Sequence, residues 1–240
     1  MNYEFFDIHS HLNIDTLYKD RDEVMQKMIG RKVGTICVGT DFRHSELAVQ
    51  IANEYKDVWA TVGQHPADNH AEEFVVEEYE KLLESKKVVA IGECGLDYYR
   101  LPKDEAEIAQ IKNKQKELFI KHVELAVKYE KPLMIHARPA KGSMDAYEDV
   151  LEILKQHKKI HANFHFFVGD MIIVKQIVEN GWTCSFDGPI TFARDYDEVI
   201  KFLPLENIMA ETDAPFAAPE PYRGKQCEPW MVEEVYKKIA

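Results

Sequence analysis

The sequence lacks the long apolar stretches, paired cysteines and leader segment that mark membrane and secreted proteins. No apolar run approaches the ~20 residues that a membrane-spanning helix requires. The first residues, MNYEFFDIHSH, contain neither the basic nor the apolar region of a secretion signal. The four cysteines are widely spaced and form no CxxC pair, which favours reduced thiols. These absences predict a cytoplasmic protein that makes no contact with a membrane.

Several short motifs of large enzyme classes are also missing. The chain contains no GxGxxG after its first apolar run, no GxxxxGK[ST] and no GxSxG, so the sequence supports neither a nucleotide-binding loop nor a serine hydrolase. The net charge of −12 argues against a broad basic surface for nucleic acid, because such surfaces attract phosphates through many lysines and arginines. A local basic patch remains compatible with this charge.

What is present is an eightfold alternation of two patterns along 240 residues, 45% of which are hydrophobic. Short apolar, β-branched runs recur at 5–12, 33–39, 58–63, 88–94, 132–137, 160–167, 182–186 and 207–211. Stretches with helical period separate them, at about 15–30, 43–56, 72–86, 105–130, 145–157, 170–180 and 193–203, with an eighth from Glu228 onwards. Nearly continuous apolar strands between amphipathic helices indicate a parallel sheet covered by helices. We therefore predict a (β/α)₈ TIM-type barrel, with residues 1–240 as a single domain.

Residues of metal-ligand type stand at or near the C-terminal ends of five of these runs. They are His9, His11, Glu93, His136, His165 and Asp213. Each alone has an ordinary alternative, such as a core histidine, a carboxylate that caps a helix, or an aspartate that begins a turn. Enzymes of this fold work at the C-terminal end of the strands, where burying six such groups without metal would be costly. Four imidazoles and two carboxylates suffice for two adjacent divalent cations.

The motifs HSHL, GQHP, GECGLDYYR, IHAR, DGPITF, ETDAPF and PYRGK occur in this order. In this respect the chain resembles the TatD-type deoxyribonucleases of the amidohydrolase superfamily over essentially its whole length. The resemblance implies a metal-dependent phosphodiesterase that acts on DNA, typically as a 3′→5′ exonuclease. It also implies the roles of particular residues: His9, His11 and Asp213 on one metal, His136 and His165 on the other, Glu93 bridging, and His65 as a substrate-facing histidine.

The chain departs from the usual family pattern beside these motifs. Phe166 and Val168 follow His165 where members usually have a small or polar residue, and Pro139 stands near a position that is usually acidic. These changes alter the lining of the pocket rather than its ligands, so they bear on substrate preference. Members also usually continue beyond the position of Ala240, which implies a shortened last helix or a truncated chain.

A two-metal hydrolysis follows from this set of side chains. Two divalent cations, Mg, Mn or Zn, lower the pKa of water and neutralise charge on a phosphoryl group, and Asp213 is expected to act as the general base. Asp7 shares the strand face of His9 and either orients an imidazole or is a structural buried acid; Glu211 has the parity of Asp213 and could act similarly. Arg223 and Lys225 are expected to contact substrate phosphates, the alternative being ordinary solvation of a loop.

The expected substrate is DNA, either single-stranded or at 3′ ends, and nothing in the sequence indicates a protein partner. A hydrolase of a small molecule, or of the ester of an aminoacyl-tRNA, would use the same ligands and the same fold. A metal-binding scaffold without activity is disfavoured, because all six ligands and the base are present.

Overall fold

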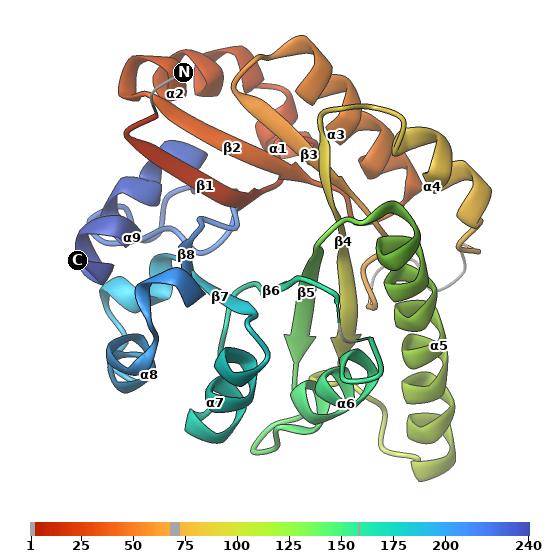
Figure 1. Ribbon diagram of the computed structural model, residues 1–240. Helices are drawn as coiled ribbons and strands as arrows, with labels where there is room; N and C mark the ends of the chain where they lie inside the picture. Colours follow the sequence, from red (N-terminus) through yellow and green to blue (C-terminus); the bar gives the residue numbers. More distant parts are fainter. Residues whose placement is uncertain (1–2, 68–72, 158) are drawn as a thin grey trace.

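The structure is a computed structural model that describes residues 3–67, 73–157 and 159–240. Its parallel strands form one eight-stranded sheet in the order of the chain, from β1 to β8. The strands are β1 (Phe5–Ser10), β2 (Val33–Val38), β3 (Val58–Val62), β4 (Val88–Asp97), β5 (Leu133–Arg138), β6 (Ala162–Phe164), β7 (Thr183–Phe186) and β8 (Ile208–Ala210). The segment after β8 reaches β1 through the bridge between Ser10 and Ala214, so the sheet curls into a nearly closed barrel (Figure 1).

Helices follow the strands and cover the outside of the barrel. They are α1 (Asp15–Tyr18), α2 (Arg21–Arg31), α3 (Phe42–Glu54), α4 (Val76–Leu82), α5 (Glu105–Tyr129), α6 (Asp145–Leu154), α7 (Met171–Glu179), α8 (Asp197–Phe202) and α9 (Val232–Ile239), with 3₁₀ turns η1 (Gly188–Thr191), η2 (Leu205–Asn207) and η3 (Pro229–Met231). The predicted (β/α)₈ barrel is thereby confirmed. No helix within these described ranges has the length and apolar character needed to cross a membrane.

Some element boundaries differ from the sequence expectation. The stretch 15–30 forms two helices rather than one, and the stretch 193–203 becomes helical only from Asp197. The run 160–167 forms a strand only over Ala162–Phe164, because Phe166 has a φ of 45° and leaves the extended conformation. β4 instead continues to Asp97, beyond the expected end at residue 94. Residue 72, at the expected start of one helix, lies outside the described residues.

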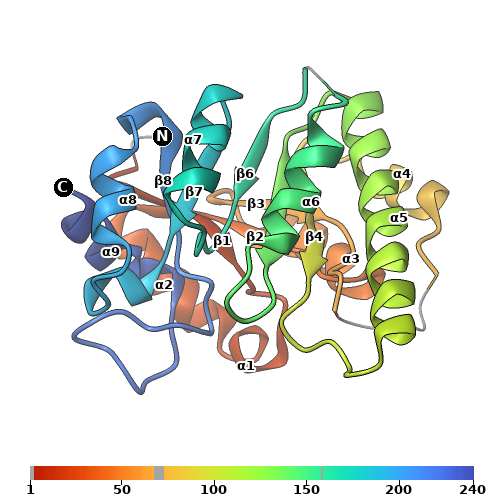
Figure 2. The same ribbon diagram turned by 90° about the horizontal axis from the view of Figure 1, so that it is seen from below.

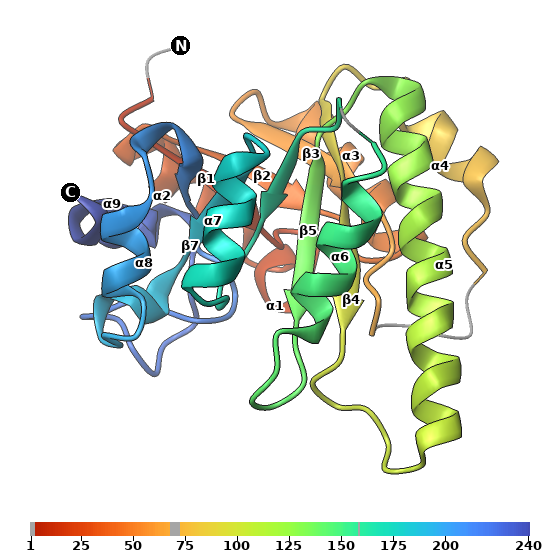
Figure 3. The same ribbon diagram turned by 60° about the horizontal axis from the view of Figure 1, so that its bottom comes forward.

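The long helix α5 shows how the sequence pattern becomes packing. The Asp104 carboxylate caps its first turn by accepting a hydrogen bond of 2.9 Å from the Glu107 N–H. Phe119, Val123 and Ala126 are buried on one stripe, as expected of an amphipathic helix. This stripe packs α5 against β4, beside which the helix runs in Figure 3. The helix thereby supports the strand that carries Glu93.

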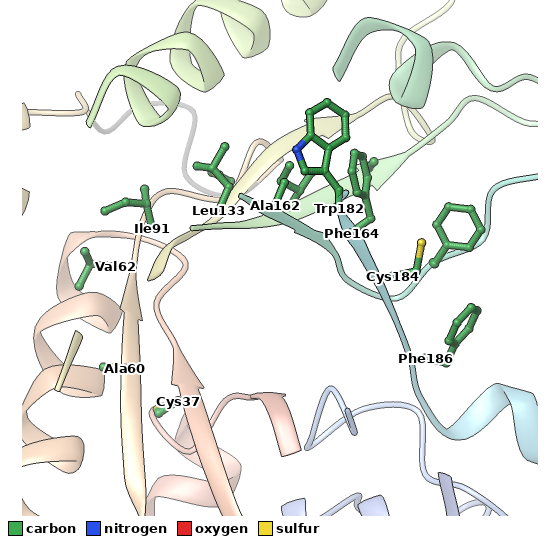
Figure 4. Close-up of a cluster of buried hydrophobic side chains, with 14 of the residues drawn as sticks. Cys37, Ala60, Val62, Ile91, Leu133, Ala162, Phe164, Trp182, Cys184 and Phe186 are labelled. Carbon is green, nitrogen blue, oxygen red and sulfur yellow. The ribbon is translucent and has the colours of Figure 1, made fainter. Parts of the chain in front are cut away.

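The barrel has an apolar outer layer and polar groups inside its wall. Apolar side chains of the strands, including Val62, Phe164 and Phe186, belong to one large buried core, part of which is drawn in Figure 4. Inside, the buried carboxylate of Asp7 accepts hydrogen bonds from the Thr212 hydroxyl at 2.7 Å and the Thr212 N–H at 2.9 Å. Hydrogen bonding of this kind makes a polar barrel interior tolerable.

The strands all point to one end of the barrel. In Figure 1 the arrowheads of β4 and β5 point to the bottom of the view, and Figure 2 shows the molecule from that side. The connections that follow the strands lie at this end, as in other barrels of this type, where they carry the active site.

Candidate metal centre

The six residues of metal-ligand type come together at the C-terminal end of the barrel. Three of them form a first group around β1 and the segment after β8. His9 Nε2 lies 3.2 Å from His11 Nε2, and Asp213 Oδ1 lies 3.3 Å from His11 Nε2 and 3.6 Å from His9 Nε2. His9 and His11 share a face of the chain, and the backbone of Asp213 is fixed because its N–H donates to the His9 carbonyl at 2.9 Å.

The second group consists of His136 on β5 and His165 directly after β6, with Glu93 of β4 beside both. Glu93 Oε1 is 3.0 Å from His136 Nδ1 and 2.8 Å from His165 Nε2. The other oxygen, Glu93 Oε2, is 3.5 Å from His9 Nε2 and 3.8 Å from His11 Nε2. Glu93 therefore stands between two histidine pairs with one oxygen toward each, an arrangement that can hold two cations on a shared carboxylate.

Two glycines place Glu93 at this point. Gly92 and Gly95 have φ values of 149° and 134°, in the region that residues with a Cβ rarely adopt. A Cβ on Gly95 would stand 2.0 Å from the His136 carbonyl oxygen, and one on Gly92 would stand 2.5 Å from the Met134 carbonyl oxygen. Only glycine allows β4 to approach β5 so closely, and this approach brings Glu93 onto His136.

Burial and opposite charges set the protonation of the centre in the metal-free protein. Burial raises the pKa of Glu93, but the nearby His165 and His65 lower it by more. The carboxyl pKa therefore lies well below its ordinary value. Burial likewise raises the pKa of Asp213, yet its hydrogen bond with His11 holds it below the ordinary value. For His165, burial lowers the pKa, and Glu93 and Glu211 more than reverse this. Both carboxylates of the centre are thus ionised at neutral pH.

Two of the ring nitrogens that face away from the centre, those of His11 and His165, have polar neighbours. His11 Nδ1 is 3.2 Å from the Val38 carbonyl oxygen, a hydrogen-bonding distance. His165 Nδ1 is 3.5 Å from Glu211 Oε1, and that carboxylate also accepts from the Phe166 N–H and the Ser185 hydroxyl, each at 2.6 Å. Contacts of this kind orient metal-binding imidazoles.

Asp7 does not orient an imidazole among the contacts of the described chain. Its carboxylate instead accepts from the backbone N–H groups of His9 and Thr212, at 3.2 and 2.9 Å. Burial raises the pKa of Asp7 well above its ordinary value, although these hydrogen bonds oppose the shift. Of the two alternatives that the sequence offered, the structure favours a buried structural acid.

A cavity of about 370 Å³ opens directly over the centre. His65 lines it, with Nε2 3.6 Å from Glu93 Oε1, so the histidine expected to face substrate lies at the site. The apolar side of the cavity contains Phe166, Val168 and Phe216. Two of these are the residues that depart from the usual family pattern, and they make part of the wall hydrophobic.

The structure does not bring every predicted residue to this cavity. Arg223 and Lys225 are exposed on the connection after β8 and do not line it. The Arg223 guanidinium lies 3.9 Å from the centre of the Phe192 ring and 3.8 Å from a Glu220 oxygen. Their expected contact with substrate phosphates therefore stays a prediction, and it requires a substrate strand that extends beyond the cavity.

One contact at the centre was missed by reading the sequence. Asp97 Oδ2 lies 3.1 Å from His136 Nε2, and this residue lies beyond the run 88–94 that was expected to form the strand. The available signal was the spacing of Glu93 and Asp97, four residues apart. It was hidden because the strand was expected to end before Asp97.

Comparisons with known proteins agree with this fold and with a metal-dependent hydrolase. A family model described as TatD related DNase matches residues 6–240. The uncharacterized metal-dependent hydrolase YabD of Bacillus subtilis (strain 168) is 36% identical over 245 residues, covering 98% of this chain and 89% of the relative. The uncharacterized metal-dependent hydrolase YcfH of Escherichia coli (strain K12) is 32% identical over 242 residues, covering 98% and 86%.

Solved structures of TatD proteins have a similar fold. The crystal structure of YjjV, a TatD homolog from Escherichia coli K12, has a TM-score of 0.84 at 25% identity, covering 98% of this chain and 88% of the other. A TatD family hydrolase from Entamoeba histolytica has a TM-score of 0.81 at 22% identity, with coverage of 100% and 91%, which shows a shared fold. Fold and side chains define the class of metal-dependent hydrolases built on a (β/α)₈ barrel. Within this class, the chain belongs to the TatD related DNase family.

Proposed function

We propose that this protein is a divalent-metal-dependent deoxyribonuclease that hydrolyses phosphodiester bonds and removes nucleotides from the 3′ ends of DNA. The observation that carries the proposal is the position of Glu93, whose two oxygens face two separate histidine pairs. Two-metal sites of this kind clamp the attacking and leaving oxygens of a phosphoryl group. The family description, TatD related DNase, supports DNA as the substrate.

In this proposal His9, His11 and Asp213 hold one cation, His136 and His165 hold the other, and Glu93 is shared. The arrangement fits cations because the ring nitrogens of His9 and His11 face one another at 3.2 Å. Both nitrogens also face Glu93 Oε2, at 3.5 and 3.8 Å, and imidazole nitrogens that converge with a carboxylate oxygen form a donor set that divalent transition metals prefer. Imidazole and carboxylate donors together are compatible with Mn and Zn, and with Mg where oxygen ligands dominate.

The bound cations would supply an activated water and neutralise charge on the phosphoryl group. Asp213 is the proposed proton acceptor, because it is ionised, lines the cavity and has a side chain that is 13% exposed. The backbone of Asp213 is held in place by the hydrogen bond that its N–H donates to the His9 carbonyl at 2.9 Å. Transfer of the proton from water to Asp213 is general base catalysis.

Substrate selection in this proposal depends on the cavity and its rim. His65 and Arg138 line the cavity on its polar side and are proposed to contact the scissile phosphate. The Arg138 guanidinium lies 4.0 Å from the centre of the Tyr99 ring, which limits its freedom. The apolar wall that contains Phe166 and Phe216 offers a surface for the terminal base or sugar. Arg223 and Lys225 are proposed to contact phosphates further along the strand.

A nuclease assay on metal-free and reconstituted protein tests the proposal. Protein stripped by a chelator should leave a 5′-labelled single-stranded oligonucleotide intact, and Mn, Mg or Zn should restore stepwise shortening from the 3′ end. His165→Gln should remove the activity, whereas the matched control His161→Gln, an exposed histidine before β6, should retain it.

The same reconstituted protein should be offered an aminoacyl ester of tRNA and a small phosphodiester. Cleavage of the aminoacyl ester without any shortening of DNA would contradict the nuclease and favour the deacylase. Equal inactivity of the His161→Gln and His165→Gln variants would mean that substitution, rather than loss of a ligand, causes the defect.

A further inference from the structure

The imidazole of His136 is held between two carboxylates of the neighbouring strand. On one side, Nδ1 lies 3.0 Å from Glu93 Oε1; on the other side, Nε2 lies 3.1 Å from Asp97 Oδ2. The pairing of β4 with β5, with Gly95 opposite His136 and Asp97 opposite Arg138, brings both acids beside the ring. The ring therefore presents one nitrogen to the metal centre and the other to Asp97.

A neutral imidazole has one N–H and one lone pair, so the two sides of the ring have different tasks. Nδ1 faces the centre, with His165 Nε2 at 3.4 Å in addition to Glu93. A ligand needs its lone pair on this nitrogen, which requires the proton to be on Nε2. We propose that Asp97 is a positioning residue that accepts this proton in a hydrogen bond and so fixes the tautomer and orientation of His136. This inference rests on the proposed function, because it assumes that His136 holds a cation.

Asp97 is itself fixed in the orientation that this task requires. Its Oδ1 accepts a hydrogen bond from the Tyr99 N–H at 3.0 Å, which leaves Oδ2 for His136. Its backbone is held by the buried side chain of Gln115 on α5. The Gln115 amide accepts from the Asp97 N–H at 2.9 Å and donates to the Asp97 carbonyl at 3.0 Å. Helix α5 thereby fixes the end of β4, and one carboxylate oxygen is directed at His136.

A different use of the same geometry has to be weighed. Donor atoms of His65, Asp97 and His136 lie within 4.8 Å of one another and could hold a third cation. This would require a lone pair on His136 Nε2 as well as on Nδ1, hence an imidazolate. His65 argues against it too, because its Nδ1 lies 3.3 Å from the Ala67 N–H, which donates to it. Its Nε2 then carries the proton and cannot bind a metal ion, so the geometry favours a positioning role.

The test compares cation binding in wild-type protein, Asp97→Ala and Asp97→Asn, with Glu105→Gln as a control for the loss of an exposed charge at the start of α5. Binding of Zn²⁺ or Mn²⁺ to metal-free protein is measured by titration calorimetry and by metal analysis. Removing an outer partner of a metal-bound histidine typically weakens metal affinity about 10–100-fold. Asp97→Ala should weaken the binding of one of the two cations by this factor and leave the affinity for the other within about 3-fold of wild type. Asp97→Asn keeps the size of the side chain but has one acceptor oxygen for two donors, so it should weaken the same cation.

The tautomer gives a readout that loss of packing would not change. In ¹⁵N-histidine-labelled protein loaded with Zn²⁺, the His136 signals, assigned by their absence in His136→Gln, should show a protonated Nε2 in the wild type. Affinities within about 3-fold of wild type in both Asp97 variants would overturn the inference while leaving the metal centre intact. A third cation that disappears on substitution would overturn it by making Asp97 a ligand. If wild-type protein binds no divalent cation, it is the proposed function that fails, and this inference fails with it. If Asp97→Ala does not fold, Asp97→Asn decides by the same criterion.

Discussion

Replacement of Asp213 by asparagine should remove the proposed base without changing the fold. Asp213 has a φ of 55°, in the left-handed region, where asparagine is among the best tolerated residues. The substitution also keeps the volume of the side chain and one of its two oxygens. In the wild type, Asp213 Oδ1 lies 3.3 Å from His11 Nε2. The backbone and the cavity should therefore be retained, and only the negative charge and the basicity should be lost.

The size of the effect follows from these two losses. General base catalysis contributes about 10²–10⁴-fold to rate, or roughly 2.7–5.5 kcal/mol in the barrier. The loss of charge should also weaken the cation that faces His9 and His11, which adds to the loss at low metal concentration. We expect kcat on single-stranded DNA to fall at least ~100-fold even at saturating Mn²⁺.

The assay follows the shortening of a labelled oligonucleotide over a range of metal concentrations, with bound metal measured in each sample. Asp195→Asn is the matched control, because Asp195 is exposed on a connection at the same end of the barrel. Turnover within about 3-fold of wild type, with both cations bound, would refute the assignment of Asp213 as the base. Activity restored in full by added metal would reduce Asp213 to a ligand only.

Two further predictions address substrate binding and pH. Arg223→Ala combined with Lys225→Ala should raise KM for DNA and reduce the slope of log affinity against log salt by about 0.7 for each lost phosphate contact; an unchanged slope would assign both residues to loop structure. Burial lowers the pKa of His122 from 6.5 to about 4, so as pH falls from 6.5 to 4 the unfolded chain takes up a proton that the folded chain does not. Stability should fall by about 3 kcal/mol over this window from His122 alone, and unfolding of His122→Gln followed against pH should lack this part of the slope.

The strands could be predicted from the sequence because each is a run of apolar residues with its own local signal. That the six candidate ligands lie close together could be predicted for the same reason, since each stands at or near the end of such a run and the ends of parallel strands meet. Boundaries were less accurate where a single backbone angle decides them. Phe166 ends β6 early by adopting a φ of 45°, and nothing in its local sequence, NFHFFV, requires this conformation.

The contacts around the ligands could not be predicted because they join positions far apart in the chain. Asp97 meets His136 and Gln115 through the register of β4 with β5 and the packing of α5. That register depends on Gly95, whose lack of a side chain lets the two strands approach. The sequence shows that a glycine is present. Which backbone atoms of the neighbouring strand lie where its side chain would stand is known only when the strands are paired.

Metal binding should also stabilise the folded protein, because the candidate ligands lie close together only in the folded chain. The rings of His9 and His165 stack with centroids 3.9 Å apart, and two ring nitrogens of His9 and His11 face each other at 3.2 Å. A cation that binds only the folded state stabilises it by about 2.7 kcal/mol per site at a free concentration 100 times its Kd. For a chain of 240 residues this corresponds to a rise in Tm of roughly 5–10 °C per site. Thermal unfolding with and without Mn²⁺ measures the shift, and His165→Gln should lose part of it while His161→Gln keeps it. A Tm that does not respond to any divalent cation would mean that the six residues are satisfied by one another, and the two-cation centre would then have to be abandoned.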